Sequence, residues 1–258
     1  MSVRIISCCL IIPFLMTLHA CKKNEEVKEV TERGAIAGTV KLYDDKTNSF
    51  SNSSGVTVAV IGMPEKFAVT GADGQFRIDG LEFENYNLSF SKTGYGTYKI
   101  YGIEHQKKTN LPAGTTSVTQ LSSVINFGAV SASSVVALSA VDATYNDLPG
   151  IEYSYSLSPE PNSSNRGYVR AFLGNKHTTS ATEYKAYASL KSVLNNNARG
   201  GFTAEELYGF GFEPNDSVYV KIYGESYFSN DYTDPSTGKR IFPNLNAVSQ
   251  DAVSFIVP

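Results

Sequence analysis

The chain has 258 residues and a formal net charge of −3 at pH 7, with 16 tyrosines, 21 glycines and no tryptophan. It carries no arginine cluster or basic face, which argues against nucleic acid as a partner. Its three cysteines and three histidines lack the spacing of metal ligands. We therefore expect neither a metal site nor a cofactor.

Residues 1–20 have the pattern of an export signal. Arg4 precedes the apolar residues 5–18, a stretch shorter than the roughly 20 residues that span a bilayer. The small Ala20 directly before Cys21 resembles the lipobox of bacterial lipoproteins, although His19 departs from that family's preference for a small residue. The resemblance implies cleavage after residue 20 and acylation of Cys21 by fatty acids such as palmitate. The alternative is a plain signal peptide followed by an incidental cysteine.

Residues 21–33 are charged and lack aromatic side chains, so we expect them to form a tether. Within it, Lys23, Asn24, Glu25 and Glu26 resemble the segment that directs lipoproteins of the Bacteroidota to the outer face of the outer membrane. That resemblance implies a protein that is lipid-anchored in the outer membrane and faces the cell exterior. A generic solvated spacer is the alternative.

Residues 34–124 show short apolar alternations separated by turn signals, which predict a β-sandwich. Asp73-Gly74 predicts a tight hairpin turn, because both of its central residues must tolerate positive φ. Tyr86, Leu88 and Phe90 alternate with period two and are expected on one face. The predicted strands lie near residues 36–42, 56–61, 67–70, 75–78 and 86–90.

An ordered set of motifs in this region resembles the carboxypeptidase regulatory-like domain. The set comprises Gly38-Thr39-Val40, Gly55-Val56-Thr57-Val58, Asp73-Gly74-x-Phe76-x-Ile78-x-Gly80-Leu81, Tyr86-x-Leu88-x-Phe90 and Lys92-x-Gly94-Tyr95. The resemblance implies a seven-stranded, transthyretin-like β-sandwich without catalytic residues. Asp73 has only Asp79 and Glu65 nearby, which favours a structural turn over a calcium site.

Residues 125–258 predict a second β-sandwich, with strands near 135–138, 151–157, 168–173, 217–223 and 252–257. Phe212-Glu213-Pro214-Asn215 leading into Tyr219 resembles an immunoglobulin-like or fibronectin type III sandwich. Thr203 and Glu206 form a capping box ahead of one helical turn. Residues 182–194 fit a helix or a strand, and the context favours a strand. The fold class expected for the whole chain is all-β, with a transthyretin-like sandwich followed by an immunoglobulin-like one, and a hinge near residues 126–134.

Catalytic motifs are missing from the sequence. It has no Gly-x-Ser-x-Gly nucleophile elbow, and neither His105 nor His177 begins the zinc-binding pattern of carboxypeptidases. Pairs of carboxylates cannot be assessed by spacing alone, and those available are Asp142, Asp147, Glu152, Asp231 and Asp234. We expect no enzymatic activity.

The second half holds 11 of the 16 tyrosines, and one aromatic loop stands out within it. Tyr227, Phe228, Asn230, Asp231 and Tyr232 combine rings that could stack on sugars with groups that bond hydroxyls. These residues predict a carbohydrate-binding module; the alternative is that the rings cap the end of the sandwich. The expected partners are the membrane, through the lipid anchor, and a glycan or an outer-membrane protein. A structural or accessory role in a surface complex or transporter remains the competing function.

Overall fold

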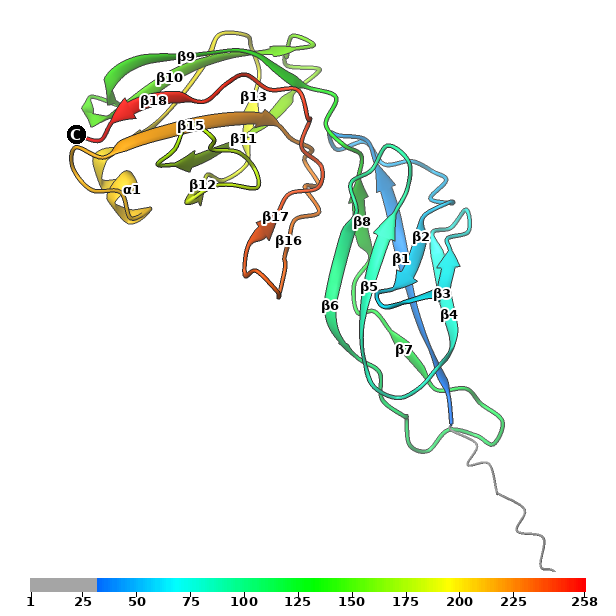
Figure 1. The fold of residues 1–258 in the computed structure, drawn as a ribbon. Coiled ribbons are helices and arrows are strands. Elements are labelled where there is room, and N and C mark those ends of the chain that lie inside the picture. The colour runs from blue at the N-terminus through cyan, green and yellow to red at the C-terminus, as the bar shows by residue number, and fades with distance from the viewer. Residues whose placement is uncertain (1–31) are drawn as a thin grey trace, which may run out of the picture. The chain divides into compact units, whose positions relative to one another are not determined.

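The computed structural model describes residues 32–258. The predictions for the signal peptide, for Cys21 and for Lys23, Asn24, Glu25 and Glu26 lie outside the described residues. Within that range the chain forms eighteen strands and a single short helix, which confirms the all-β prediction (Figure 1).

The first sandwich consists of two four-stranded sheets. One contains β4, β1 and β7 in that order, with β8 also paired to β1; the other has the order β3, β2, β5, β6. The strands are β1 (Gly34–Tyr43), β2 (Thr57–Val60), β3 (Met63–Val69), β4 (Gln75–Leu81), β5 (Asn85–Ser91), β6 (Tyr98–Glu104), β7 (Val118–Gln120) and β8 (Ile125–Gly128). Apolar side chains that alternate along β1, β2, β4 and β5 meet in one buried core, and Tyr86, Leu88 and Phe90 lie on one buried face as predicted.

The Asp73-Gly74 turn exists, but the hairpin expected around it does not. Gly74 has a φ of +77°, and the Asp73 carboxylate accepts a hydrogen bond of 3.0 Å from the Gln75 backbone. However, β3 pairs with β2 while β4 pairs with β1. The chain therefore crosses from one sheet to the other at this turn, because the two flanking strands pair with partners in separate sheets.

The boundary between the sandwiches lies later than residue 125. Strand β8 runs parallel to β1, with Ile125 opposite Val40 and Phe127 opposite Leu42. Ile125 and Phe127 are both buried in the first core. Residues 125–128, expected in the second domain, thus belong to the first sandwich, since their apolar side chains complete its core.

The second sandwich packs a three-stranded sheet against a five-stranded one. The first has the order β14, β10, β9; the second has the order β12, β11, β15, β18, with β13 also paired to β11. These strands are β9 (Ser134–Tyr145), β10 (Leu148–Ser158), β11 (Gly167–Gly174), β12 (Ala186–Tyr187), β13 (Lys191–Val193), β14 (Ala198–Thr203), β15 (Ser217–Gly224) and β18 (Val253–Ile256).

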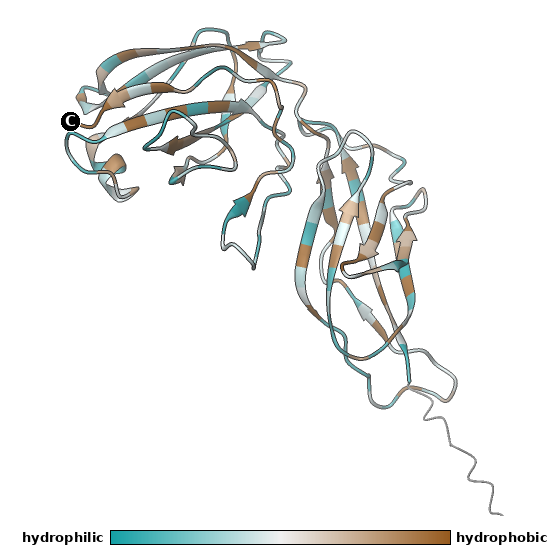
Figure 2. Ribbon diagram, in the orientation of Figure 1, coloured by the Kyte–Doolittle hydropathy of each residue, from teal (hydrophilic) through white to brown (hydrophobic). Residues whose placement is uncertain are grey.

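Alternation of side chains fixes the core of this sandwich. Val218, Val220 and Ile222 of β15 point inward, and the ribbon along β15 alternates between hydrophobic and hydrophilic colours (Figure 2). Tyr219 lies between these buried positions and is only half-buried. Residues 186–193 contribute two short strands instead of a helix, as the context had suggested.

The predicted capping box is present at the only helix of the described residues, α1 (Ala204–Gly209). The Thr203 hydroxyl accepts a hydrogen bond from the Glu206 backbone, and the Glu206 carboxylate accepts one from the Thr203 backbone. Leu207 of this helix is fully buried in the second core. One helical turn therefore closes an end of the sandwich through a single apolar side chain.

Between β15 and β18 the chain leaves the sandwich for a long excursion, residues 225–252. This excursion contains a small hairpin of β16 (Tyr232–Thr233) and β17 (Arg240–Ile241). The Tyr184 hydroxyl donates a 2.8 Å hydrogen bond to the Arg240 carbonyl, which holds the hairpin against the second sandwich. The aromatic residues singled out in the sequence all lie in this excursion.

Candidate functional site

The start of the excursion packs against the first sandwich. The backbone N–H of Tyr227 donates a 3.0 Å hydrogen bond to the carbonyl of Asp45. The Phe228 ring lies 4.2 Å, centroid to centroid, from the ring of Tyr43. Tyr227 itself is 46% exposed and has the ring of Tyr168 beside it at 5.4 Å. Phe228 is therefore a packing residue, whereas Tyr227 keeps an accessible face.

Two asparagines bind the excursion to the end of β8. The Asn244 side chain is fully buried, and its amide group donates to the carbonyls of Gly128 and Phe228 at 3.0 and 2.7 Å. Its carbonyl accepts a 3.0 Å bond from the Gly96 backbone. The Asn230 side chain accepts from the Gly128 backbone at 2.8 Å. These amides replace the backbone partners that irregular segments lack. The Asn230 side chain is therefore engaged in an internal hydrogen bond instead of facing a ligand.

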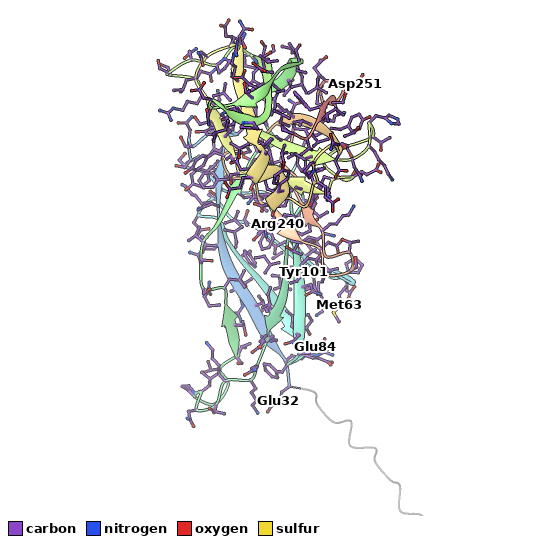
Figure 3. All side chains as sticks on the ribbon, turned by 90° about the vertical axis from the view of Figure 1, so that its left-hand side faces the viewer. Glu32, Met63, Glu84, Tyr101, Arg240 and Asp251 are labelled. Atoms are coloured by element: carbon purple, nitrogen blue, oxygen red, sulfur yellow. The ribbon has the colours of Figure 1, made fainter. Side chains whose placement is uncertain are left out.

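Beyond these asparagines, three tyrosines from distant parts of the chain converge; we call Tyr98, Tyr101 and Tyr232 the tyrosine cluster. The Tyr232 ring of β16 lies 6.3 Å from the ring of Tyr98 and 6.1 Å from that of Tyr101, both on β6. The ammonium of Lys99 is 5.8 Å from the centre of the Tyr232 ring. All three rings are partly exposed. Tyr101 and the nearby Arg240 are labelled in Figure 3.

A carboxylate adjoins the tyrosine cluster. Asp231 forms an ion pair with Arg240 and accepts a hydrogen bond from the Ser229 hydroxyl. Burial opposes ionisation of Asp231, but the bond from Ser229 and the Arg240 guanidinium outweigh it and hold the pKa below its ordinary value. Burial, reinforced by the Asp231 charge, raises the pKa of Tyr98. The cluster thus places three phenol rings beside a carboxylate that its partners keep ionised.

A second charged pair lies deeper in the excursion. The Arg170 guanidinium donates a 2.5 Å hydrogen bond to Glu225, and both side chains are buried. The guanidinium also lies 4.5 Å from the centre of the Phe242 ring. Desolvation exceeds the attraction of Arg170 and raises the pKa of Glu225 to about 7. One oxygen of Glu225 has no hydrogen-bond partner among the described residues. This pair is closed off from solvent, because Glu225 is 1% and Arg170 is 7% exposed.

The sequence identified part of this arrangement. Asp231 and Tyr232 were singled out and lie at the tyrosine cluster, while Phe228 and Asn230 lie at the contact with the first sandwich. Tyr98 and Tyr101 were missed, because they precede Tyr232 by more than 130 residues and no local pattern couples them. Tyr98 and Tyr101 lie three positions apart on a strand whose burial does not alternate there, so strand periodicity gave no signal that both rings share a site.

The remaining carboxylates and possible metal ligands do not assemble a second centre. Glu152 is paired with Arg199 at 2.8 Å, as Asp231 is with Arg240. Among residues 32–258, no group of three or more His, Cys, Asp or Glu side chains is placed to hold a metal ion. In the same range, no helix is both long enough and apolar enough to cross a membrane.

Comparison with known proteins gives structural similarity only. No protein-family model matches the chain, and no curated protein matches it. A proposed carbohydrate-binding protein from Bacteroides uniformis is 10% identical, with 87% of this chain and 99% of that one covered and a TM-score of 0.32. A DUF3823 family protein from Bacteroides ovatus is 12% identical, with 88% and 100% covered and a TM-score of 0.29.

A shorter match is found to a type II cohesin–X–dockerin complex from Acetivibrio cellulolyticus. It is 22% identical, covers 38% of this chain and has a TM-score of 0.29. The chain spans 59% of the length of that matched chain. These similarities are too distant to assign a ligand or an activity.

Proposed function

We propose that this protein is a non-catalytic, lipid-anchored protein of the outer membrane that binds glycan at the cell surface through its tyrosine cluster. The observation that carries the proposal is the convergence of Tyr98, Tyr101 and Tyr232 beside Asp231 and Lys99. The surface here gathers three partly exposed rings and two charges. The packing of the fold does not require such a group.

The chemistry of the cluster fits a sugar. Tyrosine rings offer flat apolar faces, and their hydroxyl groups remain polar handles. The axial C–H groups of a pyranose can lie on such a face while its hydroxyls bond to a carboxylate or an ammonium. Tyr227, whose ring is also exposed, extends the aromatic surface of the same excursion.

A glycan array tests this function with the soluble protein, residues 22–258. Tyr101→Ala and Tyr232→Ala should each weaken binding of the best glycan at least about tenfold, equivalent to about 1.4 kcal/mol. Tyr208→Ala, which removes another exposed tyrosine on α1, should leave binding unchanged. Equal affinity of all three variants, with unchanged melting temperatures, would place any glycan site elsewhere.

Anchoring is tested separately in cells. Cys21→Ser should release the protein from membranes and abolish labelling by a fatty-acid analogue, since acylation supplies the attachment. Alanine at Lys23, Asn24, Glu25 and Glu26 should preserve labelling but remove protease accessibility on whole cells. Membrane retention by the Cys21→Ser protein would contradict lipid anchoring at Cys21. Continued protease accessibility of the alanine variant would contradict an export signal at residues 23–26.

One observation favours the accessory role as a second function. Strand β9 is an edge of its sheet, and Val136, Val141 and Leu148 on β9 and β10 are each more than two-fifths exposed. Exposed apolar side chains along an open edge suit docking to another protein. A photo-crosslinker at position 141 should then yield one discrete adduct with an outer-membrane protein in cells, and a crosslinker at Asp73 should not.

A further inference from the structure

A cavity of about 590 Å³ lies inside the second sandwich, away from the tyrosine cluster. Both sheets contribute to its walls, together with α1 and the segment that joins β12 to β13. Aromatic rings make up a large part of the lining: Tyr145, Tyr153, Tyr155, Tyr187, Phe202 and Phe210. A concave, ring-lined space of this size is typical of small-molecule sites.

The sequence creates this space with small residues. A Cβ atom on Gly200 would lie 2.5 Å from the Tyr153 ring, and one on Gly201 would lie 2.3 Å from the Tyr145 ring. The two glycines of β14 therefore let both rings lie against the backbone. On the opposite sheet the short side chains of Ala171 and Ala188 line the cavity and leave room between the sheets.

The rim of the cavity is held in place by hydrogen bonds. The Ala188 backbone donates to the Ala171 carbonyl at 2.9 Å. The Ala188 carbonyl in turn accepts a 2.7 Å bond from the buried Arg170 guanidinium. The segment between β12 and β13 is thereby fixed to β11 although it forms no continuous strand. These hydrogen bonds keep the cavity open at this edge of the sheet.

The lining carries two opposite charges, the Glu206 carboxylate and the Lys191 ammonium, and each is hydrogen-bonded to the backbone. The Glu206 carboxylate accepts from the Thr203 backbone at 2.8 Å, and the Lys191 ammonium donates to the Arg199 carbonyl at 2.8 Å. Burial raises the pKa of Tyr153 and Tyr155 above the ordinary value, so both phenols stay protonated. The Tyr155 hydroxyl is buried without a partner among the described residues. The carboxylate and the ammonium cancel, so the lining carries no net charge that would favour a charged ligand.

We propose that this cavity is a binding site for an uncharged small molecule with an aromatic ring. The rings of Tyr153 and Phe202 lie 6.1 Å apart and those of Phe202 and Phe210 lie 5.7 Å apart. A planar ligand can pack edge-on or face-on against such surfaces. The site is independent of the proposed glycan binding, since it shares no residue with the tyrosine cluster.

Indole is the probe, because the protein contains no tryptophan and bound indole is detected above a background of tyrosine alone. Residues 22–258 should bind indole saturably, and indole-3-acetate, which carries a charge, should bind at least about tenfold more weakly. Ala171→Leu, which puts a larger apolar side chain into the cavity, should reduce the affinity for indole at least about tenfold. Tyr101→Ala at the tyrosine cluster should leave it unchanged.

A second variant covers the case in which Ala171→Leu fails to fold. Phe210→Ala removes a partly buried ring from the wall and should also weaken indole binding at least about tenfold while the protein still melts cooperatively. Absence of saturable indole binding by the unmutated protein would overturn the proposal. So would binding that survives in both folded variants, or that is lost with Tyr101→Ala.

Discussion

Replacing Gly74 with alanine tests the crossing between the two sheets of the first sandwich. Gly74 has a φ of +77°, and a Cβ atom there would lie 1.9 Å from the Val40 carbonyl oxygen. The left-handed conformation costs an alanine about 1–2 kcal/mol. Relieving the contact moves the turn by about 1 Å and weakens the 2.9 Å bond from the Val40 backbone to the Gly74 carbonyl, which is worth about 1 kcal/mol.

Together with disturbed packing of the fully buried Val40, these contributions amount to about 3 kcal/mol or more. For a protein of this size that lowers the melting temperature by about 6–12 °C. Gly94→Ala is the matched control, since Gly94 has a φ of +84° but nothing within 4 Å of its Cβ position. It should cost only the roughly 1–2 kcal/mol of the left-handed conformation, because no steric contact is added.

Urea unfolding followed by tyrosine circular dichroism measures both variants. If Gly74→Ala and Gly94→Ala lose the same stability, the close approach to Val40 contributes nothing and the reasoning is refuted.

Three further predictions concern the excursion and the helix. Asn244→Leu leaves the carbonyls of Gly128 and Phe228 without donors and should cost about 3 kcal/mol or more. The melting temperature should fall, and proteolysis within residues 225–252 should become faster. Proteolysis at the parental rate would contradict this prediction. Glu225 has a raised pKa in the folded state, so the folded protein holds its proton more tightly and stability should fall as the pH rises from about 4.5 to about 7. Glu225→Gln should flatten that dependence in unfolding curves at several pH values, and an unchanged slope would show that another group titrates. Thr203→Ala should cost about 1 kcal/mol by removing the capping box, and chemical denaturation that detects no loss would argue against it.

Alternation in the sequence predicted several strands that have one face buried and the other solvated. Strands β5 and β15 are of this kind, as is β10 from Ile151 onward, and their buried residues occupy every second position. Strand β14 was missed because Gly200-Gly201 reads as a turn. The two glycines instead accommodate the rings of Tyr153 and Tyr145, a reason that only the neighbouring strand supplies.

Long-range pairing set the limit for both the fold and the site. The Asp73-Gly74 signal correctly placed a turn but could not reveal which strands it joins, since β4 finds its partner about 40 residues earlier in β1. The aromatic loop at residues 227–232 was visible in the sequence. The contribution of Tyr98 and Tyr101 was not, because local patterns carry no information on which distant strand a loop contacts.

The excursion between β15 and β18 has a consequence for how the chain can be divided. Its Asn244 side chain bonds to Gly128, and its Phe228 ring packs on Tyr43, so a piece of the second half completes the surface of the first. A fragment that ends after β8 would leave the Gly128 carbonyl and the Tyr43 ring uncovered. Truncations and gene fusions should therefore keep residues 34–258 together. We also expect evolution to retain the two sandwiches as a pair and not to recombine them separately.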